Sequence, residues 1–105
     1  MKLDAVEKMD RKMFKGMMLA QNGQMFTDET FGTTVVVVPA CGRTDSEFVQ
    51  VAVAQCSPGD EFKRKRGELV ALERWADGCV LSVRRNGRCL QAVADDMVGF
   101  LTMDL

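Results

Sequence analysis

The sequence predicts an α+β fold built as a single small domain, residues 1–105, and three local patterns carry this prediction. They are an apolar repeat at helical spacing near the N-terminus, a β-branched run, and an Asn-Gly pair between two apolar stretches. A chain of 105 residues can enclose one hydrophobic core but is short for two. In chain order we expect an N-terminal helix (3–21), an antiparallel β-hairpin (33–38 and 48–55), a central helix (58–76), a second antiparallel β-hairpin (79–85 and 88–94) and a short C-terminal element (95–105).

The N-terminal helix is predicted from an apolar stripe that recurs every three or four residues. Its members are Leu3, Val6, Met13, Met17 and Ala20. Asn22-Gly23 provides a C-terminal stop. Five of the eight methionines, at positions 9, 13, 17, 18 and 25, lie in this helix or just after it, and their flexible side chains suit core packing or a dimer seam better than a ligand site.

Residues 33–38 and 48–55 are expected to pair as an antiparallel hairpin. The first stretch is β-branched throughout and lacks polar alternation, so we expect it to be central in its sheet and covered on both faces. In the second stretch Val49, Val51 and Val53 recur at every second position, which is the period of a strand.

The central helix is predicted to begin at Pro58. Residues 57–60, Ser-Pro-Gly-Asp, place a hydroxyl N-cap, a proline at the first helical position and a carboxylate three residues after the cap. Gly67 costs about 1 kcal/mol relative to alanine inside a helix, so it either lets another backbone approach closely or marks a break, and we expect the close approach. The predicted buried stripe consists of Phe62, Leu69, Leu72 and Ala76.

The second hairpin is predicted from its turn. Residues 85–88, Arg-Asn-Gly-Arg, have at their centre the pair that accepts the positive φ angles of a type I′ turn. The resulting register places Val83 opposite Leu90 on an apolar face. Residues 95–105 are expected to form a short helix or an edge strand that docks on the domain or on a second copy.

The sequence disfavours a membrane-spanning, secreted or metal-binding protein. No run approaches the roughly 20 apolar residues of a membrane helix and no export signal is visible, so we expect a cytoplasmic protein without membrane contact. The four cysteines have no Cys-x-x-Cys spacing and the chain has no histidine, so we expect buried thiols and no metal site.

Catalysis is not expected. Without histidine, acid–base chemistry would need a carboxylate pair at a suggestive spacing, and none is present. The chain also lacks a glycine-rich phosphate loop, and no base is placed by sequence next to a cysteine. We therefore expect no catalytic residue and no cofactor, and look for a binding surface.

Basic residues are concentrated in the second half of the chain. The net charge is −1, but residues 63–88 hold eight bases and three acids. Arg84, Arg85 and Arg88 crowd the predicted hairpin tip, where like charges repel unless an anion or an acidic surface compensates them. Alternatively, salt screens this repulsion at an exposed tip without any partner. The candidate binding residues are Arg84, Arg85, Arg88, Lys63, Arg66 and Arg74.

Residues 48–75 resemble a pattern common in small bacteriophage and prophage accessory proteins of unassigned function. The pattern, Cys-x3-Asp-x-Phe-x2-Lys-x-Gly-x3-Ala-x2-Arg, runs here from Cys56 to Arg74. The resemblance implies a protein that acts by binding host machinery or host immune signals.

Three functions follow from these observations. The first is a host-directed inhibitor or anti-defence protein that binds a host protein or a nucleic-acid-containing complex through the basic surface. In that case, replacing the three hairpin arginines by alanine should abolish binding and leave the melting temperature nearly unchanged. The second is an oligomeric sponge for a small nucleotide signal. The third, direct nucleic-acid binding, is disfavoured by the near-zero net charge and the absence of tyrosine. A homodimer would form through the methionine-rich N-terminal helix or the C-terminal segment.

Overall fold

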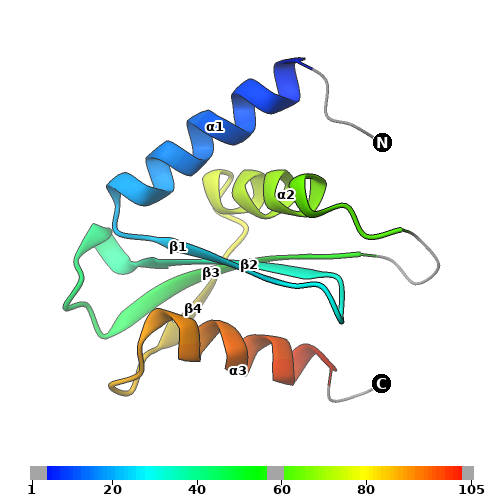
Figure 1. Cartoon of the computed structure of the whole chain (residues 1–105). Coiled ribbons are helices and arrows are strands. Elements are labelled where there is room, and N and C mark those ends of the chain that lie inside the picture. Colours follow the sequence, from blue (N-terminus) through cyan, green and yellow to red (C-terminus); the bar gives the residue numbers. More distant parts are fainter. Residues whose placement is uncertain (1–4, 57–60, 103–105) are drawn as a thin grey trace.

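The chain folds as one antiparallel sheet with helices on both faces, which confirms the α+β class (Figure 1). The computed structural model describes residues 5–56 and 61–102. The strand order across the sheet is β1-β2-β3-β4. The elements are α1 (Ala5–Ala20), β1 (Gln24–Asp28), β2 (Thr33–Pro39), the short 3-10 helix η1 (Ala40–Gly42), β3 (Phe48–Gln55), α2 (Arg64–Ala76), β4 (Leu81–Arg84) and α3 (Leu90–Thr102).

The β-branched run forms β2, the strand around which the core is built. All seven residues of β2 are buried, and the strand pairs with β1 on one side and β3 on the other. Its side chains alternate between faces, so Val36 and Val38 pack with α1 and α2, while Val35 and Val37 pack with α3. The prediction of a central, doubly covered strand is confirmed, as is its antiparallel pairing with residues 48–55.

Helices cover both faces of the sheet. α2 lies directly on the strands and α1 lies outside it, while α3 covers the opposite face (Figure 1). α2 contacts β2 and β3, whereas α1 contacts mainly α2. Because α1 is the outermost element, only part of its circumference can be buried.

β1 is a strand that the sequence pattern did not predict. It pairs antiparallel with β2, and its Met25 and Phe26 join the cores on opposite faces of the sheet. Oδ1 of Asp28 accepts a hydrogen bond of 3.2 Å from the Phe31 N–H in the turn that follows, where Gly32 has a φ of 60°. A five-residue strand with polar residues at both ends is defined by its packing rather than by its local sequence.

The predicted N-terminal helix is confirmed within the described residues, but its buried face is not the predicted one. Met18 is buried and Phe14 packs beside it against α2. Val6, Met13, Met17 and Ala20 of the predicted stripe are exposed, and Leu3 lies outside the described residues. The prediction was wrong because α1 rests on α2 through the opposite side of the helix.

The central helix begins later than predicted, at Arg64, and ends at Ala76 as expected. Residues 61–63 are not helical, and Lys63 has extended dihedral angles (φ −117°, ψ 110°). Lys63 also forms an ion pair with Glu61, which suits an extended chain because side chains two positions apart do not face each other on a helix. The predicted cap at residues 57–60 lies outside the described residues.

The interior of α2 follows the prediction in part. Leu69 and Leu72 are buried, whereas Phe62 precedes the helix and Ala76 is exposed. A Cβ atom placed on Gly67 would lie 2.8 Å from the Oγ1 of buried Thr34. A neighbour does approach this glycine closely, but the nearest atoms belong to side chains and not to the backbone that was expected.

The second predicted hairpin forms its turn and its first strand but not its second. Asn86 and Gly87 have φ angles of 53° and 78°, and the Arg88 N–H donates to the Arg85 carbonyl over 3.1 Å, as a type I′ turn requires. Residues 81–84 form β4, whose Val83 lies opposite Val49 of β3 and not opposite Leu90. After the turn the chain enters α3, so the strand predicted at 88–94 is wrong.

A helical stripe explains why residues after the turn form α3. Its members, spaced three or four apart or adjacent, pack together on the sheet: Leu90, Val93, Ala94, Met97 and Val98. A strand would send Val93 and Ala94 to opposite faces, yet both are buried in the same cluster. Of the two alternatives for residues 95–105, the helix is confirmed for 95–102, and it docks on the domain.

Candidate functional site

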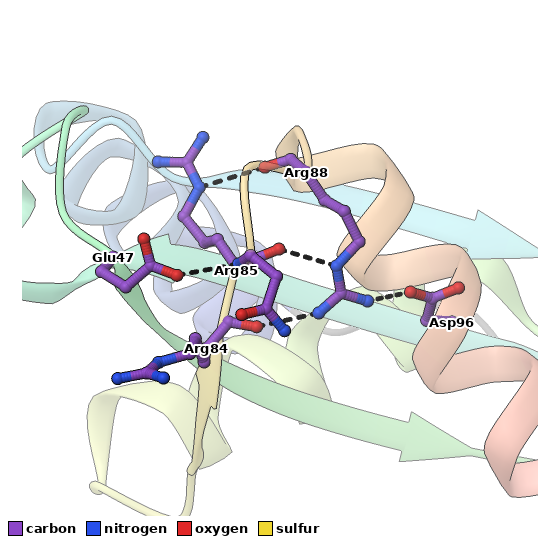
Figure 2. A network of polar contacts seen from close by, with 6 residues as sticks. Glu47, Arg84, Arg85, Arg88 and Asp96 are labelled. Carbon is purple, nitrogen blue, oxygen red and sulfur yellow. Dashed lines mark hydrogen bonds and ion pairs between the residues drawn. The ribbon is translucent and has the colours of Figure 1, made fainter.

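The fold brings Arg84, Arg85 and Arg88 together at the turn between β4 and α3 (Figure 2). Arg85 reaches the loop that precedes β3. Its Nη1 donates to the carbonyl of Thr44 over 2.7 Å and to that of Ser46 over 3.3 Å, and its Nε donates to the carbonyl of Arg88 over 3.2 Å. Arg85 therefore ties this loop to the turn.

Arg88 folds back over the same turn. Its Nε donates to the carbonyl of Arg85 over 2.7 Å and its Nη2 to the carbonyl of Arg84 over 2.8 Å, while its Nη1 forms an ion pair with Asp96 of α3 (Figure 2). Arg88 thus fastens the start of α3 to the end of β4, and its charge is compensated within the chain.

Arg84 is the exposed member of the three. The central carbon of its guanidinium lies 5.4 Å from the centre of the Phe48 ring on the neighbouring strand, and Phe48 is itself 46% exposed. A cation–π contact at an exposed site contributes about 0.5–1 kcal/mol. Arg84 can still present its charge to a partner, because this contact covers only one face of the guanidinium.

A hollow of about 220 Å³ lies beside this turn, and its lining has mixed charge. Arg85 and Arg88 line it together with Asp45 and Glu47. The Oε1 of Glu47 accepts a hydrogen bond of 2.9 Å from the Asn86 N–H (Figure 2). The hollow beside the turn therefore presents carboxylates as well as guanidinium groups to a partner.

Lys63, Arg66 and Arg74 do not extend this cluster, because they belong to α2 and its N-cap, on the face of the sheet opposite α3 (Figure 1). The side-chain hydrogen bond with Glu61 raises the pKa of Lys63. Arg66 forms an ion pair with Glu7 of α1, and Arg74 donates to a backbone carbonyl of β3 over 2.5 Å. The structure thus separates the three arginines of the turn from Lys63, Arg66 and Arg74, each of which has a different partner.

An exposed apolar stripe runs along α1. Val6, Met9, Met13 and Met17 are 67%, 71%, 54% and 45% exposed. Spacings of three and four residues place them on one face of the helix, and we call these four residues the α1 stripe. Neighbouring exposed apolar side chains of this size mark an interaction surface more often than isolated ones do.

The opposite face of α1 holds the stripe outward. Phe14 and Met18 pack into the core beneath α1. Arg11 forms an ion pair of 2.9 Å with Glu68 of α2, and both side chains are largely buried. Since breaking a buried ion pair leaves an uncompensated charge, α1 cannot roll its apolar stripe inward without a large loss of stability.

Three lysines lie on one flank of α1, between its anchored face and the α1 stripe. Lys8, Lys12 and Lys15 are exposed and follow one another at four- and three-residue spacing. None of them forms an ion pair with another residue in the described ranges. We call these residues the lysine rim, and their charge is available to an acidic partner.

The apolar repeat of α1 is visible in the sequence, where it was assigned to the core or a dimer seam. Met9 was not included in the predicted stripe. A second stripe was present in the sequence, with Glu7, Arg11, Phe14 and Met18 at spacings of four, three and four. Half of this stripe is charged, and its ion-pair partners lie on α2, more than fifty residues away. The sequence of α1 alone therefore does not reveal which stripe is buried.

The cysteines do not form part of the core, so the prediction of buried thiols was wrong. Cys41 in η1 is exposed, as are Cys79 and Cys89 in the connections after α2 and before α3, and Cys56 is half-buried. Within residues 5–56 and 61–102, no three side chains among histidine, cysteine, aspartate and glutamate gather as a metal site would need. None of the helices in these ranges combines the length and apolar character required to cross a membrane.

The sequence was compared with protein-family models, with curated proteins and with solved structures, and none of these comparisons finds a match.

Proposed function

We propose that this chain is a non-enzymatic binding protein that seats the α1 stripe in an apolar groove of a host protein in the host cytoplasm and so inhibits or modulates that protein. The host-directed role is what the resemblance to phage accessory proteins implies. The observation that carries the binding role is the exposure of four large apolar side chains on one face of a helix whose other face is anchored.

The spacing of the α1 stripe suits a helix that lies in a groove. Its anchors stand at positions i, i+3, i+7 and i+11, as in other helix-in-groove complexes. Three of the four anchors are methionines, whose flexible and polarizable side chains adapt to an irregular surface. Because the helix is already folded and held by α2, binding does not have to order it.

The lysine rim specifies the chemistry of the partner. Lys8, Lys12 and Lys15 lie on the flank of α1 beside Met9, so a groove that encloses this flank has carboxylates along one side. We place the main contact here and not at the arginine turn, since Arg85 and Arg88 direct their donors to carbonyl groups of the protein itself and to Asp96.

The test compares two double variants with equal changes in charge. Met9→Glu/Met13→Glu disrupts the α1 stripe, whereas Leu81→Glu/Phe100→Glu changes two exposed apolar residues on β4 and α3. Each tagged protein is expressed in the natural host, the captured protein is identified, and its affinity is then measured with purified components. We expect the α1 variant to bind at least tenfold more weakly than the wild type and the control variant to bind like the wild type.

Three outcomes would contradict this proposal. One is equal binding by the two double variants. Another is a wild-type homodimer that Met9→Glu/Met13→Glu converts to a monomer, which would make the stripe a dimer seam. A third is a small nucleotide retained in native mass spectrometry, with no protein partner, which would favour the sponge function.

A further inference from the structure

A second hollow, of about 260 Å³, lies between β1 and α3, on the face of the sheet opposite α1. On the α3 side it is lined by Gln91, Ala94, Asp95 and Val98. These residues stand at positions i, i+3, i+4 and i+7, so a single face of α3 forms one wall. On the β1 side it is lined by residues 25–28.

The β1 wall is the outer edge of the sheet. Four consecutive strand residues line the hollow, and since consecutive side chains point to opposite faces, one face of the strand could not present all four. β1 stands at the end of the strand order and, among the described residues, pairs with β2 alone. The hollow therefore runs along the unpaired backbone edge of β1.

The ladder indicates which backbone groups point into this groove. The Cys56 N–H donates to the carbonyl of Gly32, the residue directly opposite it, so the two form a hydrogen-bonded pair. Because such pairs recur at every second residue, the backbone N–H and C=O groups of the even-numbered residues of β2 point toward β3, and those of the odd-numbered residues point toward β1. The β1 partners of those odd-numbered residues are Gln24, Phe26 and Asp28. The N–H and C=O groups of Met25 and Thr27 are therefore directed outward, where a further strand could bond them.

The side chains of the groove combine an apolar floor with an acidic rim. Phe26, Ala94 and Val98 belong to the core cluster beneath α3. Asp28 and Asp95 line the same hollow, and no base of the described chain forms an ion pair with either. This arrangement favours an occupant with apolar and cationic side chains.

We propose that this groove binds an extended, lysine- or arginine-containing peptide segment of another protein, which adds to β1 as a fifth strand. Backbone bonds to Met25 and Thr27 would supply affinity, and the carboxylates of Asp28 and Asp95 would select cationic side chains. β1 has five residues and spans about 17 Å, which sets the length of the docked segment. A second copy of this chain fits less well, because pairing two β1 edges would bring two sets of these carboxylates to one seam.

The test uses two end-capped, fluorescein-labelled peptides, Thr-Lys-Val-Lys-Val-Thr and its counterpart with glutamate in place of lysine. We expect only the lysine peptide to bind, with amide shifts in residues 25–28 and 91–98. Thr27→Pro removes an outward N–H without touching the ladder to β2, and Thr27→Val retains it. We expect a loss of tenfold or more for Thr27→Pro and little change for Thr27→Val.

The charge of the groove is tested with a matched pair of variants. Asp28→Asn/Asp95→Asn should weaken binding of the lysine peptide roughly five- to tenfold, because two carboxylates are lost while the amide oxygen introduced at position 28 can still accept the turn hydrogen bond. Glu73→Gln/Asp77→Asn removes two exposed acids of α2 and its C-cap and should leave the affinity unchanged.

Any of four results overturns the proposal: no binding of the lysine peptide at about 1 mM, wild-type affinity in Thr27→Pro, equal affinity for the two peptides, or a homodimer of the protein that Thr27→Pro dissociates. The α1 variants leave this groove intact, so failure here is distinct from failure of the α1 contact.

Discussion

Arginine serves two purposes at the turn before α3. Arg85 and Arg88 use their guanidinium groups to bond backbone carbonyls from the turn itself and from the preceding loop, whereas Arg84 lies over an exposed ring. A planar guanidinium with five donors is suited to such bridging, which a lysine could not replace. The charge cluster that suggests a binding tip in the sequence is therefore largely a structural device.

Arg88→Met should lower the free energy of unfolding by about 1–3 kcal/mol, because two carbonyl bonds and the ion pair with Asp96 are lost together. Arg84→Met should change it by less than about 1 kcal/mol, since only an exposed ring contact is lost. Urea denaturation measures both. This expectation replaces the one drawn from the sequence, that all three arginines can be removed without an effect on thermal stability, and equal values for the two variants would contradict it.

Gly67→Ala should destabilise the fold by about 1 kcal/mol or more, although alanine is the better helix former. The new methyl group would meet the Thr34 Oγ1 at 2.8 Å inside the core, and overpacking of this kind outweighs the gain in helix propensity. Gly16→Ala is the matched control, because nothing lies within 4 Å of its added Cβ, and it should stabilise α1 by roughly 0.5–1 kcal/mol. Thermal unfolding of the two variants should therefore shift in opposite directions.

At the scale of elements, the sequence predicted those that carry their own signal. The β-branched run identified β2 and its burial, and the Asn-Gly pair identified a turn with positive φ angles. Elements that depend on distant partners were missed or misassigned. β1 exists because β2 offers it an edge, and α3 forms because its 3.6-residue stripe matches the valine face of the sheet better than the short alternation after the turn does.

Prediction of the candidate site from the sequence failed for the same reason, because it depends on residues of distant elements. The positions of the bases were known, but the acids that pair with them and the carbonyls that accept their hydrogen bonds come from other elements, such as Asp96 for Arg88 and Glu7 for Arg66. The α1 stripe was visible as a repeat, and only the packing of α1 on α2 shows that it faces outward.

The orientation of α1 can be tested with two methionines five residues apart. Met18→Ala should reduce the free energy of unfolding by about 2–4 kcal/mol, because its side chain is fully buried between α1 and the sheet. Met13→Ala should change it by no more than about 0.5 kcal/mol, because this side chain is 54% exposed. Chemical denaturation gives both values, and a similar loss in the two variants would mean that α1 is rotated from the orientation described here.

At the scale of the whole molecule, the two candidate surfaces lie on opposite sides of the sheet and differ in charge. α1 carries three lysines on one flank beside its stripe, whereas two aspartates line the groove between β1 and α3. A net charge of −1 conceals this separation. Because the β-sheet core separates them, both surfaces can be occupied at the same time.

The lysine rim makes a distinct prediction about salt. Binding of the host partner through α1 should weaken only about three- to tenfold between roughly 50 and 300 mM salt, because three exposed lysines contribute a screened attraction while the apolar stripe provides most of the affinity. Replacing Lys8, Lys12 and Lys15 by glutamine should remove most of this salt dependence and retain binding at high salt. The matched control replaces three exposed cations elsewhere on the molecule, Arg43, Lys65 and Arg84, by glutamine, and it should behave like the wild type. Binding titrations over this range give the dependence of affinity on salt for each protein. If the dependence is steep and only the control variant loses it, the binding surface consists of the basic residues outside α1.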